Sequence, residues 1–333
     1  MQYRNLGRSG LKVSVLGLGT MTFGENQWGL GGVDQPRADR MVAMALDYGM
    51  NFFDTADVYA MGESEQFLGR ALGSRRHEVV LATKARSRMG SGVHAAGLSR
   101  KHLYDAVHQS LRRLKTDYID LYQLHGFDAE VPMEETLETL HTLVQQGWVR
   151  YIGLSNFAAW QMAKAVTLQR CRAVEPFISA QMHYSLVNRD IEHEVVPAAV
   201  DLGLGLIVWS PLSGGFLSGK YRSGAVLAES RIQDLESSFP PFDVQAGLNL
   251  MEPLAEVAER LQVSMASVSL AWVKDQPGVS SVLIGARKLE QLEDNLEAAD
   301  LTLAAADQDR LASLTAPKAL YPGWMIQSQA SGD

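Results

Sequence analysis

Short runs of apolar residues alternate with amphipathic stretches along most of the chain, with a period of about thirty residues. In the amphipathic stretch MEETLETLHTLVQQG, Leu137, Leu140 and Val144 recur at steps of three and four residues, and Gly147 supplies a C-terminal stop. Such an alternation of strands and helices predicts a parallel sheet covered by helices. The expected strands are VSVLGLG, NFFDTA, VVLATK, IDLYQL, VRYIGLS, FISAQMH, LGLIVWS and SVLIGA.

Three segments depart from this alternation. Near the N-terminus, NLGRSG is typical of a hairpin turn. After the seventh strand, GGFLSGKYRSGAVLAESRIQDLESSFPPF delays the next helices, MEPLAEVAERL and MASVSLAWVKDQ, and we expect a long loop on the functional face. The C-terminal APKALYPGWMIQSQASGD is predicted to be a second irregular segment.

Composition narrows the class of protein. The chain has 333 residues, of which 46% are hydrophobic and 20% charged, as in soluble globular proteins, and without a linker pattern we expect one domain over residues 1–333. A net charge of −8 argues against a nucleic-acid or anionic-membrane partner. No apolar stretch is long enough to span a membrane, and MQYRNLGRSGLK lacks the apolar region of a signal peptide, so we expect a cytoplasmic protein.

A single cysteine, Cys171, cannot form an intramolecular disulfide, and we expect it to be a buried structural thiol. No cluster of cysteine and histidine has the spacing of zinc ligands, so no metal is expected.

Four chemically distinct side chains follow the ends of three consecutive strands: Asp54, Tyr59, Lys84 and His125. Because the carboxyl ends of parallel strands converge, groups far apart in sequence can meet there. The order of these residues therefore predicts an active site.

Two glycine-rich strings approach known nucleotide-binding motifs without completing them. GLGTM lacks the third glycine of a dinucleotide fingerprint, because Thr22 stands in its place, although Asp54 could bind a ribose in a Rossmann dehydrogenase. GGFLSGKY has Tyr221 where a P-loop needs a serine or threonine to bind magnesium, which argues against a nucleotide triphosphatase. Its backbone amides and Lys220 could still hold a pyrophosphate. Eight repeats rather than six also disfavour the Rossmann fold.

A further anion site is predicted after the last strand. Gly285 and Arg287 directly precede a helix, whose N-terminus favours negative charge. Since an arginine can hold a phosphate with two hydrogen bonds, we expect a phosphorylated ligand here.

The chain resembles the aldo-keto reductases over nearly its whole length. The segments that carry the resemblance are NFFDTADVYAMGESEQFLGRAL, GLSNF, SAQMHYSLVNR, WSPLSGGFLSGKY and GARKLEQLEDN. The most similar members are bacterial aryl-alcohol dehydrogenase-like reductases and potassium-channel β subunits, whereas GARKLEQ departs from the lysine-serine phosphate clamp of the aldose-reductase branch. The resemblance implies a (β/α)8 TIM barrel with an N-terminal hairpin, reduction of carbonyls with NADP(H), and a small-molecule carbonyl as the substrate.

The resemblance also implies roles for individual residues. Asp54, Tyr59, Lys84 and His125 form the catalytic tetrad. Ser155, Asn156 and Gln181 bind the nicotinamide carboxamide, Trp209 stacks on the ring, Ser210, Leu212 and Lys220 hold the pyrophosphate, and Arg287, Gln291 and Asn295 bind the 2′-phosphate and adenine. Further cofactor contacts are expected at Gly19, Thr20, Met21, Asp54, Pro211, Gly214, Arg231 and Gly285. Phe23, Trp28, Tyr321 and Trp324 are candidate walls of an apolar substrate pocket beside Tyr59 and His125.

A mechanism follows from the tetrad. A free tyrosine donates its proton poorly at neutral pH, and we expect the Lys84 ammonium to lower the pKa of the Tyr59 phenol. Asp54 would fix Lys84, and His125 would orient the carbonyl oxygen.

Two other functions remain open from the sequence. Lys84 could form a Schiff base, as in an aldolase on the same barrel. The chain could also be a regulatory subunit that binds the cofactor with little turnover, although such a binder does not need an intact tetrad.

Overall fold

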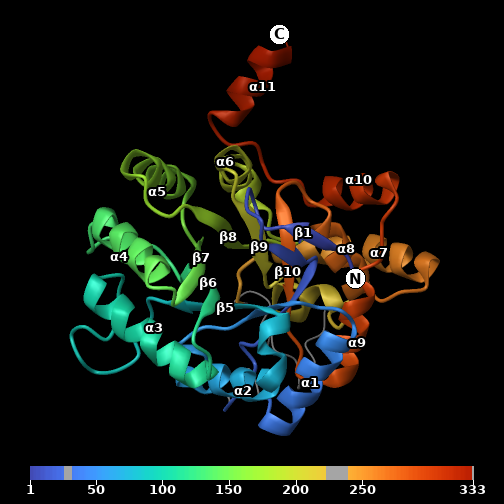
Figure 1. Ribbon diagram of the computed structural model, residues 1–333. Helices are drawn as coiled ribbons and strands as arrows, with labels where there is room; N and C mark the ends of the chain where they lie inside the picture. The colour runs from blue at the N-terminus through green and yellow to red at the C-terminus, as the bar shows by residue number, and fades with distance from the viewer. Residues whose placement is uncertain (26–31, 223–238, 332–333) are drawn as a thin grey trace.

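The computed structural model describes residues 1–25, 32–222 and 239–331. Eight parallel strands close into a barrel in the order β10-β3-β4-β5-β6-β7-β8-β9, and Figure 1 shows helices arranged around it. The eight-stranded parallel barrel and the N-terminal hairpin predicted from the sequence are thus confirmed. The strands are β3 (Leu16–Gly19), β4 (Phe52–Asp54), β5 (Val80–Ala85), β6 (Ile119–Leu124), β7 (Val149–Ser155), β8 (Phe177–His183), β9 (Gly205–Trp209) and β10 (Val279–Ile284).

Helices follow most strands in the pattern of βα units. They are α1 (Gln35–Asp47), α2 (Glu63–Leu72), α3 (Arg100–Leu114), α4 (Met133–Gln145), α5 (Ala159–Arg172), α6 (Val195–Leu202), α7 (Val244–Leu261), α8 (Met265–Lys274), α9 (Leu289–Glu297), α10 (Ala305–Leu314) and α11 (Gly323–Ser331), with short 3-10 turns η1 (Tyr59–Gly62), η2 (Gly73–Glu78), η3 (Asp190–Glu192) and η4 (Ser213–Ser218). The start of α1 is fixed by Asp34, whose side chain accepts a hydrogen bond from the Arg37 amide, and by a proline in the first turn.

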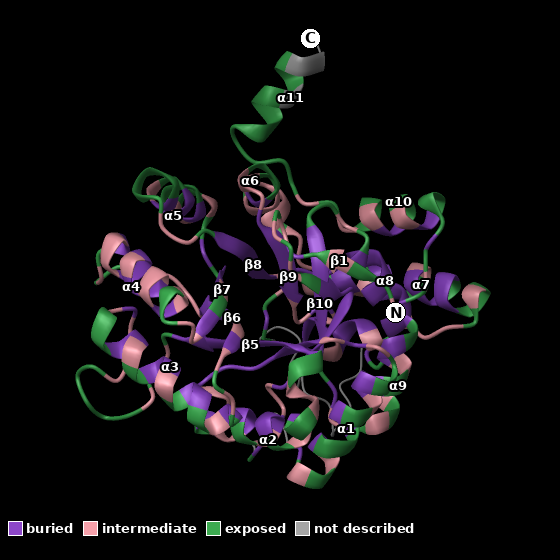
Figure 2. Cartoon of the chain, viewed as in Figure 1, coloured by how far each residue is buried: buried purple, intermediate pink, exposed green. Residues whose placement is uncertain are grey.

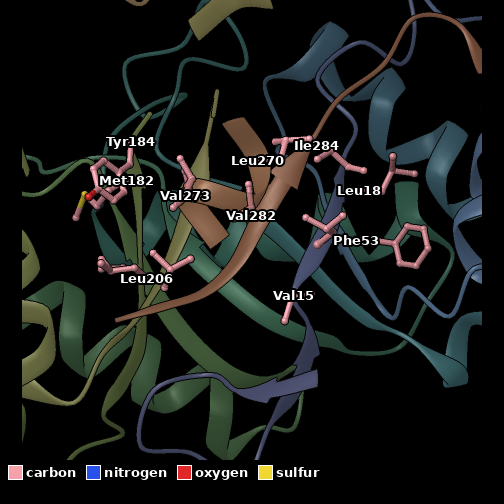
Figure 3. Packing of buried hydrophobic residues seen from close by; sticks show 14 of the residues in the cluster. Val15, Leu18, Phe53, Met182, Tyr184, Leu206, Leu270, Val273, Val282 and Ile284 are labelled. Atoms are coloured by element: carbon pink, nitrogen blue, oxygen red, sulfur yellow. The ribbon is translucent and has the colours of Figure 1, made fainter. Parts of the chain in front are cut away.

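The apolar residues divide between two cores. The larger core lies between the barrel and its helices, where Leu270 and Val273 of α8 lie beside Val282 of β10 (Figure 3). Figure 2 shows the buried residues concentrated on the strands and on the inward faces of the helices. This division explains why the barrel strands are rich in apolar residues, since both of their faces are covered.

The second core lies inside the barrel and includes Leu6 and Val13 from the N-terminal hairpin β1 (Tyr3–Asn5) and β2 (Lys12–Ser14). The run VSVLGLG, predicted as one strand, is divided at Val15 between this hairpin and β3. The Arg8 amide donates to the Gly203 carbonyl oxygen at 2.9 Å, which attaches the hairpin turn to the loop before β9. The hairpin therefore contributes to the apolar filling of the barrel.

Two expectations were wrong. Cys171 is exposed on α5 rather than buried, because α5 turns that position away from the barrel. The C-terminal segment contains α11, which projects away from the barrel in Figure 1.

Candidate active site

A buried ion pair forms the centre of the site. Asp54 ends β4, and Lys84 lies in the neighbouring strand β5; the exposed fractions of their side chains are 3% and 0%. The Lys84 ammonium donates to Oδ1 of Asp54 and, at 2.8 Å, to the Thr55 carbonyl oxygen. It also lies 3.5 Å from the hydroxyl of Tyr59. The three groups are held together by adjacent elements rather than by a flexible loop.

Tyr59 and His125 complete the group of four predicted from the sequence. Tyr59 begins η1, and His125 follows β6, with its backbone amide donating to the Ala85 carbonyl oxygen at 3.0 Å. Their rings meet edge to face with centroids 5.8 Å apart. Ala60 and Met61, which follow Tyr59, both adopt left-handed backbone conformations, an unusual geometry for residues with side chains. The structure thus brings all four side chains to one place.

Burial has a larger effect on the Tyr59 phenol than its charged neighbours have. Desolvation raises the pKa of Tyr59 above its ordinary value, while the nearby Lys84 ammonium acts to lower it. The expected effect of Lys84 is present, but the expected net lowering of the pKa was wrong for this structure, because burial is the larger effect. At neutral pH the phenol therefore keeps its proton.

Lys84 carries a positive charge, whereas His125 is neutral. Burial lowers the pKa of Lys84, but Asp54 and Tyr59 outweigh it, so that the pKa is raised and the side chain remains an ammonium. Burial, with the charges of Lys84 and Arg86, lowers the pKa of His125 to about 3, so that its imidazole is neutral. A neutral imidazole can donate one hydrogen bond to a carbonyl oxygen without adding a charge.

Sequence reasoning missed Gln123, which belongs to the same network. Its Nε2 donates to Oδ2 of Asp54 at 2.9 Å, and Nε2 of Gln181 donates to the same oxygen at 2.8 Å. A signal was available, because residues two apart in a strand share a face and Gln123 precedes His125 by two.

Asp57 was also missed. Its carboxyl is fully buried, and in the described part of the chain neither oxygen has a hydrogen-bond partner of good geometry. Burial, then the carboxylate of Glu65, raises the pKa of Asp57 to about 8, against the smaller opposing effects of Arg113 and Lys84. Glu65 itself accepts from Thr83 and Arg113. This second carboxyl therefore holds a proton at neutral pH.

Residues assigned to the nicotinamide lie beside this network. The Ser155 hydroxyl donates to the Gln181 carbonyl oxygen at 2.9 Å. Asn156, which has a φ of +57°, donates through Nδ2 to the His125 carbonyl oxygen and accepts from Nε1 of Trp209 at 3.1 Å. The Trp209 ring stacks on His183, with centroids 4.6 Å apart. Asn156 thus links the ends of β6, β7 and β9.

The segment after β9 forms a tight turn at the expected pyrophosphate site. Ser210 has a φ of +51°, and its hydroxyl accepts from the Gly214 amide at 3.3 Å. Pro211 is buried, Leu212 is half-buried, and Lys220 is exposed after η4. The backbone therefore folds compactly here and leaves Lys220 available to an anion.

The segment between β10 and α9 contains the expected phosphate-binding residues. Gln291 accepts from the amides of Arg287 and Lys288 at 3.1 and 3.3 Å, so its side-chain oxygen is used as a cap in this structure. Arg287 is half-exposed, Gly285 is exposed, and Asn295 is 5% exposed on the inner side of α9.

The loop after β3 contains both buried and partly exposed residues among those predicted to contact the cofactor or substrate. Thr20 is buried and bonds to Asp54 and Ser64, so it holds the loop to β4 and α2. Gly19 and Met21 are half-buried. Phe23 is 1% exposed within the large core, which removes it from the walls of an open pocket in this structure.

Of the remaining predicted residues, two pocket candidates from the C-terminal segment are described by the structure and lie away from the tetrad. Trp28 and Arg231 lie outside the described residues. Tyr321 and Trp324 contact each other, with ring centroids 6.1 Å apart, in the C-terminal segment that projects from the barrel (Figure 1). Their side chains are exposed, so the structure gives them no place in a substrate pocket.

Within the described ranges, no three histidine, cysteine, aspartate or glutamate side chains gather in a way that could hold a metal ion. A membrane span needs a longer and more apolar helix than any in these same ranges.

Comparison with known proteins identifies the family. The model of the Aldo/keto reductase family matches residues 15–316. The chain is 37% identical over 308 residues to a probable voltage-gated potassium channel subunit beta of Arabidopsis thaliana, an alignment that covers 90% of this chain and 92% of the relative. It is 38% identical over 315 residues to the uncharacterized oxidoreductase YrpG of Bacillus subtilis (strain 168), with 91% and 92% covered. It is 31% identical over 343 residues to the versiconal hemiacetal acetate reductase of Aspergillus parasiticus, with 97% and 99% covered. With this barrel and these matches, the chain belongs to the aldo/keto reductase family, whose members are oxidoreductases acting on carbonyl compounds.

Proposed function

We propose that this protein reduces aldehydes or ketones to alcohols with NADPH, that Tyr59 is the proton donor, and that residues 1–333 act as one catalytic domain. The observation that supports this most directly is the position of the Tyr59 hydroxyl, 3.5 Å from an ammonium that is itself paired with a buried carboxylate. When Tyr59 gives up its proton, the phenolate that results lies beside a positive charge, which stabilises it against the opposing effect of burial.

The reaction needs two transfers to the carbonyl group. NADPH, when bound, supplies a hydride to the carbonyl carbon. As negative charge develops on the oxygen, His125 donates a hydrogen bond that orients it and Tyr59 transfers its proton. Lys84 stabilises the phenolate, and Asp54 holds Lys84 in place.

The side chains present fit a nicotinamide cofactor. Trp209 offers a flat apolar ring, and Gln181 and Ser155 place polar groups on adjacent strands. Arg287 and the N-terminus of α9 supply positive charge for a phosphate group, which favours NADPH over NADH.

A Schiff-base aldolase is a weaker proposal. A nucleophilic lysine must lose its proton, but Asp54 and Tyr59 raise the pKa of Lys84 against the effect of burial. The amine is therefore held in its unreactive protonated form.

A regulatory role is the second candidate, because two relatives of 37% and 39% identity are named as potassium channel β subunits. A subunit that only senses the cofactor would bind NADPH without consuming it in the presence of carbonyl compounds. The complete set of Asp54, Tyr59, Lys84 and His125 favours turnover over this alternative.

One assay distinguishes a reductase from a regulatory subunit that only binds the cofactor. Loss of NADPH absorbance is followed with aromatic aldehydes, dicarbonyls and sugars, and cofactor binding is followed by quenching of tryptophan fluorescence. We expect oxidation of NADPH with at least one compound. Binding without oxidation across the panel favours the regulatory subunit, and absence of binding contradicts both.

Replacement of the proton donor gives the first mutational prediction. Tyr59→Phe should lower kcat by about 10²–10⁴-fold, since a positioned general acid contributes on this order, and should leave the dissociation constant of NADPH nearly unchanged. Turnover close to that of the unmodified protein would contradict the assignment.

A further inference from the structure

The second oxygen of the Asp54 carboxylate is bound by two side-chain amides from different strands. Nε2 of Gln123 donates to Oδ2 at 2.9 Å, and Nε2 of Gln181 donates to it at 2.8 Å. The two amides also bond to each other, because Nε2 of Gln181 donates to Oε1 of Gln123 at 3.1 Å. A closed arrangement of three side chains therefore connects the carboxylate that holds Lys84 to a residue beside the nicotinamide position.

The chemistry of the carboxylate fixes the orientation of both amides. An ionised carboxylate only accepts hydrogen bonds, so both glutamines must turn their nitrogens toward Asp54. Gln123 then offers its oxygen to the second N–H group of Gln181. Both N–H groups of Gln181 are used in this way, and its Oε1 is the polar atom left for a ligand. Gln181 is consequently held as a hydrogen-bond acceptor.

The surroundings hold Gln123 in this position. Its side chain is fully buried, and its neighbour in register on β7 is Gly153. A Cβ at Gly153 would lie 3.2 Å from Cγ of Gln123 and 2.4 Å from Oγ of Ser179. The absence of a side chain on β7 thus leaves the space through which amides from β6 and β8 meet.

We propose that Gln123 is a positioning residue that fixes the orientation of the Gln181 carboxamide. In this orientation Oε1 of Gln181 accepts a hydrogen bond from the NH2 group of the nicotinamide carboxamide, so the site prefers cofactors that carry this group. It acts through Asp54 and Gln181 rather than by touching the substrate. This inference rests on the proposed nicotinamide cofactor, but it does not require turnover.

A binding experiment tests the inference directly. NADP+ and its 3-acetylpyridine analogue differ in that a methyl group replaces the NH2, so only NADP+ can donate to Oε1 of Gln181. We expect the unmodified protein to bind NADP+ roughly tenfold more tightly than the analogue, in line with loss of one buried hydrogen bond. Gln123→Met, which keeps the length of the side chain but removes both hydrogen bonds, should reduce this ratio to about two. An unchanged ratio would overturn the proposal.

Gln169→Met is the matched control. Gln169 is equally buried. Its side-chain amide donates to the Glu175 carbonyl oxygen and accepts from the Phe177 amide at the start of β8, away from the tetrad. It should lose stability as Gln123→Met does while keeping the preference for NADP+. If Gln169→Met also loses the preference, general loosening of the barrel explains the result and the proposal fails.

A second variant supplies an independent readout if Gln123→Met does not fold. In Gln123→Glu the introduced carboxyl can donate to Asp54 only while it is protonated. Its ratio of NADP+ to analogue affinity, relative to the unmodified protein, should be high at low pH and fall as pH rises. A relative ratio that is low at every pH between 5 and 9 would contradict the inference. Reductase activity is measured in parallel, so that the proposed reductase function and the role of Gln123 can fail separately. Activity with an unchanged binding ratio refutes only the role of Gln123. A shifted ratio without activity refutes only the reductase function.

Discussion

At the scale of single residues, burial decides which ionisable groups carry charge. His125 and Tyr59 are neutral at pH 7 because desolvation penalises their charged forms, whereas Lys84 stays charged because Asp54 pairs with it. Asp57 shows the cost of burial without such a pair. Its pKa is raised to about 8, although Lys84 and Arg113 lie near enough to oppose the shift.

Asp57→Asn should therefore change how stability depends on pH. The folded protein holds a proton on Asp57 that the unfolded chain releases above its pKa of 3.8, so folding becomes less favourable as pH rises from about 4 to about 8. The neutral amide removes this cost, and the free energy of unfolding at pH 7 should increase by up to roughly 4 kcal/mol, with little gain at pH 4.

Urea denaturation of both proteins at pH 4.5, 6 and 8 measures the effect. A stability difference that stays constant across this range would show that Asp57 is ionised in the folded protein.

At the scale of elements, the start of α9 combines a guanidinium with a helix N-terminus. Arg287→Gln should raise the dissociation constant of NADPH by about tenfold or more, the effect of losing a charge-assisted hydrogen bond. The dissociation constant of NADH should change by less than about twofold, since NADH has no 2′-phosphate. Fluorescence titration with the two cofactors measures both constants.

The control for Arg287→Gln is Arg310→Gln on α10, which removes an exposed arginine paired with Glu256. It should leave both dissociation constants unchanged. Equal changes for NADPH and NADH in Arg287→Gln would refute the phosphate contact.

The N-terminal hairpin is the element with the clearest contribution to stability. Leu6 is fully buried in the core inside the barrel, together with Ile178 and Ile207 from β8 and β9. Leu6→Ala should lower the free energy of unfolding by about 2–5 kcal/mol, as expected for a buried leucine. The half-buried Leu11 provides a comparison, and Leu11→Ala should cost less. Urea denaturation measures both, and equal losses would argue against a specific role for Leu6.

At the scale of the whole molecule, the barrel could be predicted from the sequence because the same pattern of strand and helix is repeated along the chain. Each parallel strand is buried on both faces and each helix on one, so apolar runs and amphipathic stretches mark every unit. The tetrad could be predicted from the sequence for the same reason, since Asp54, Lys84 and His125 lie at or near strand ends.

What the sequence did not reveal depends on contacts between distant segments. Strand alternation places Gln123 on the same face as His125, but Gln123 and Asp57 obtain their partners from segments that the closed barrel brings to them. No local pattern encodes the distance from Gln123 to Gln181. The net pKa of Tyr59 likewise depends on how deeply the barrel buries it. Phe23 and Tyr321 have similar aromatic character in the sequence, yet one is in the core and the other is exposed.

The central claim is that hydride passes from NADPH to a carbonyl carbon at the site around Tyr59. The most direct measurement uses NADPH that carries deuterium at both C4 positions of the nicotinamide and determines, by mass spectrometry, where the label appears after turnover with a carbonyl compound. The account predicts one deuterium on the carbinol carbon of the alcohol, and almost no labelled product with Tyr59→Phe. Bound NADPH that yields no labelled alcohol, or label transfer unaffected by Tyr59→Phe, would contradict it.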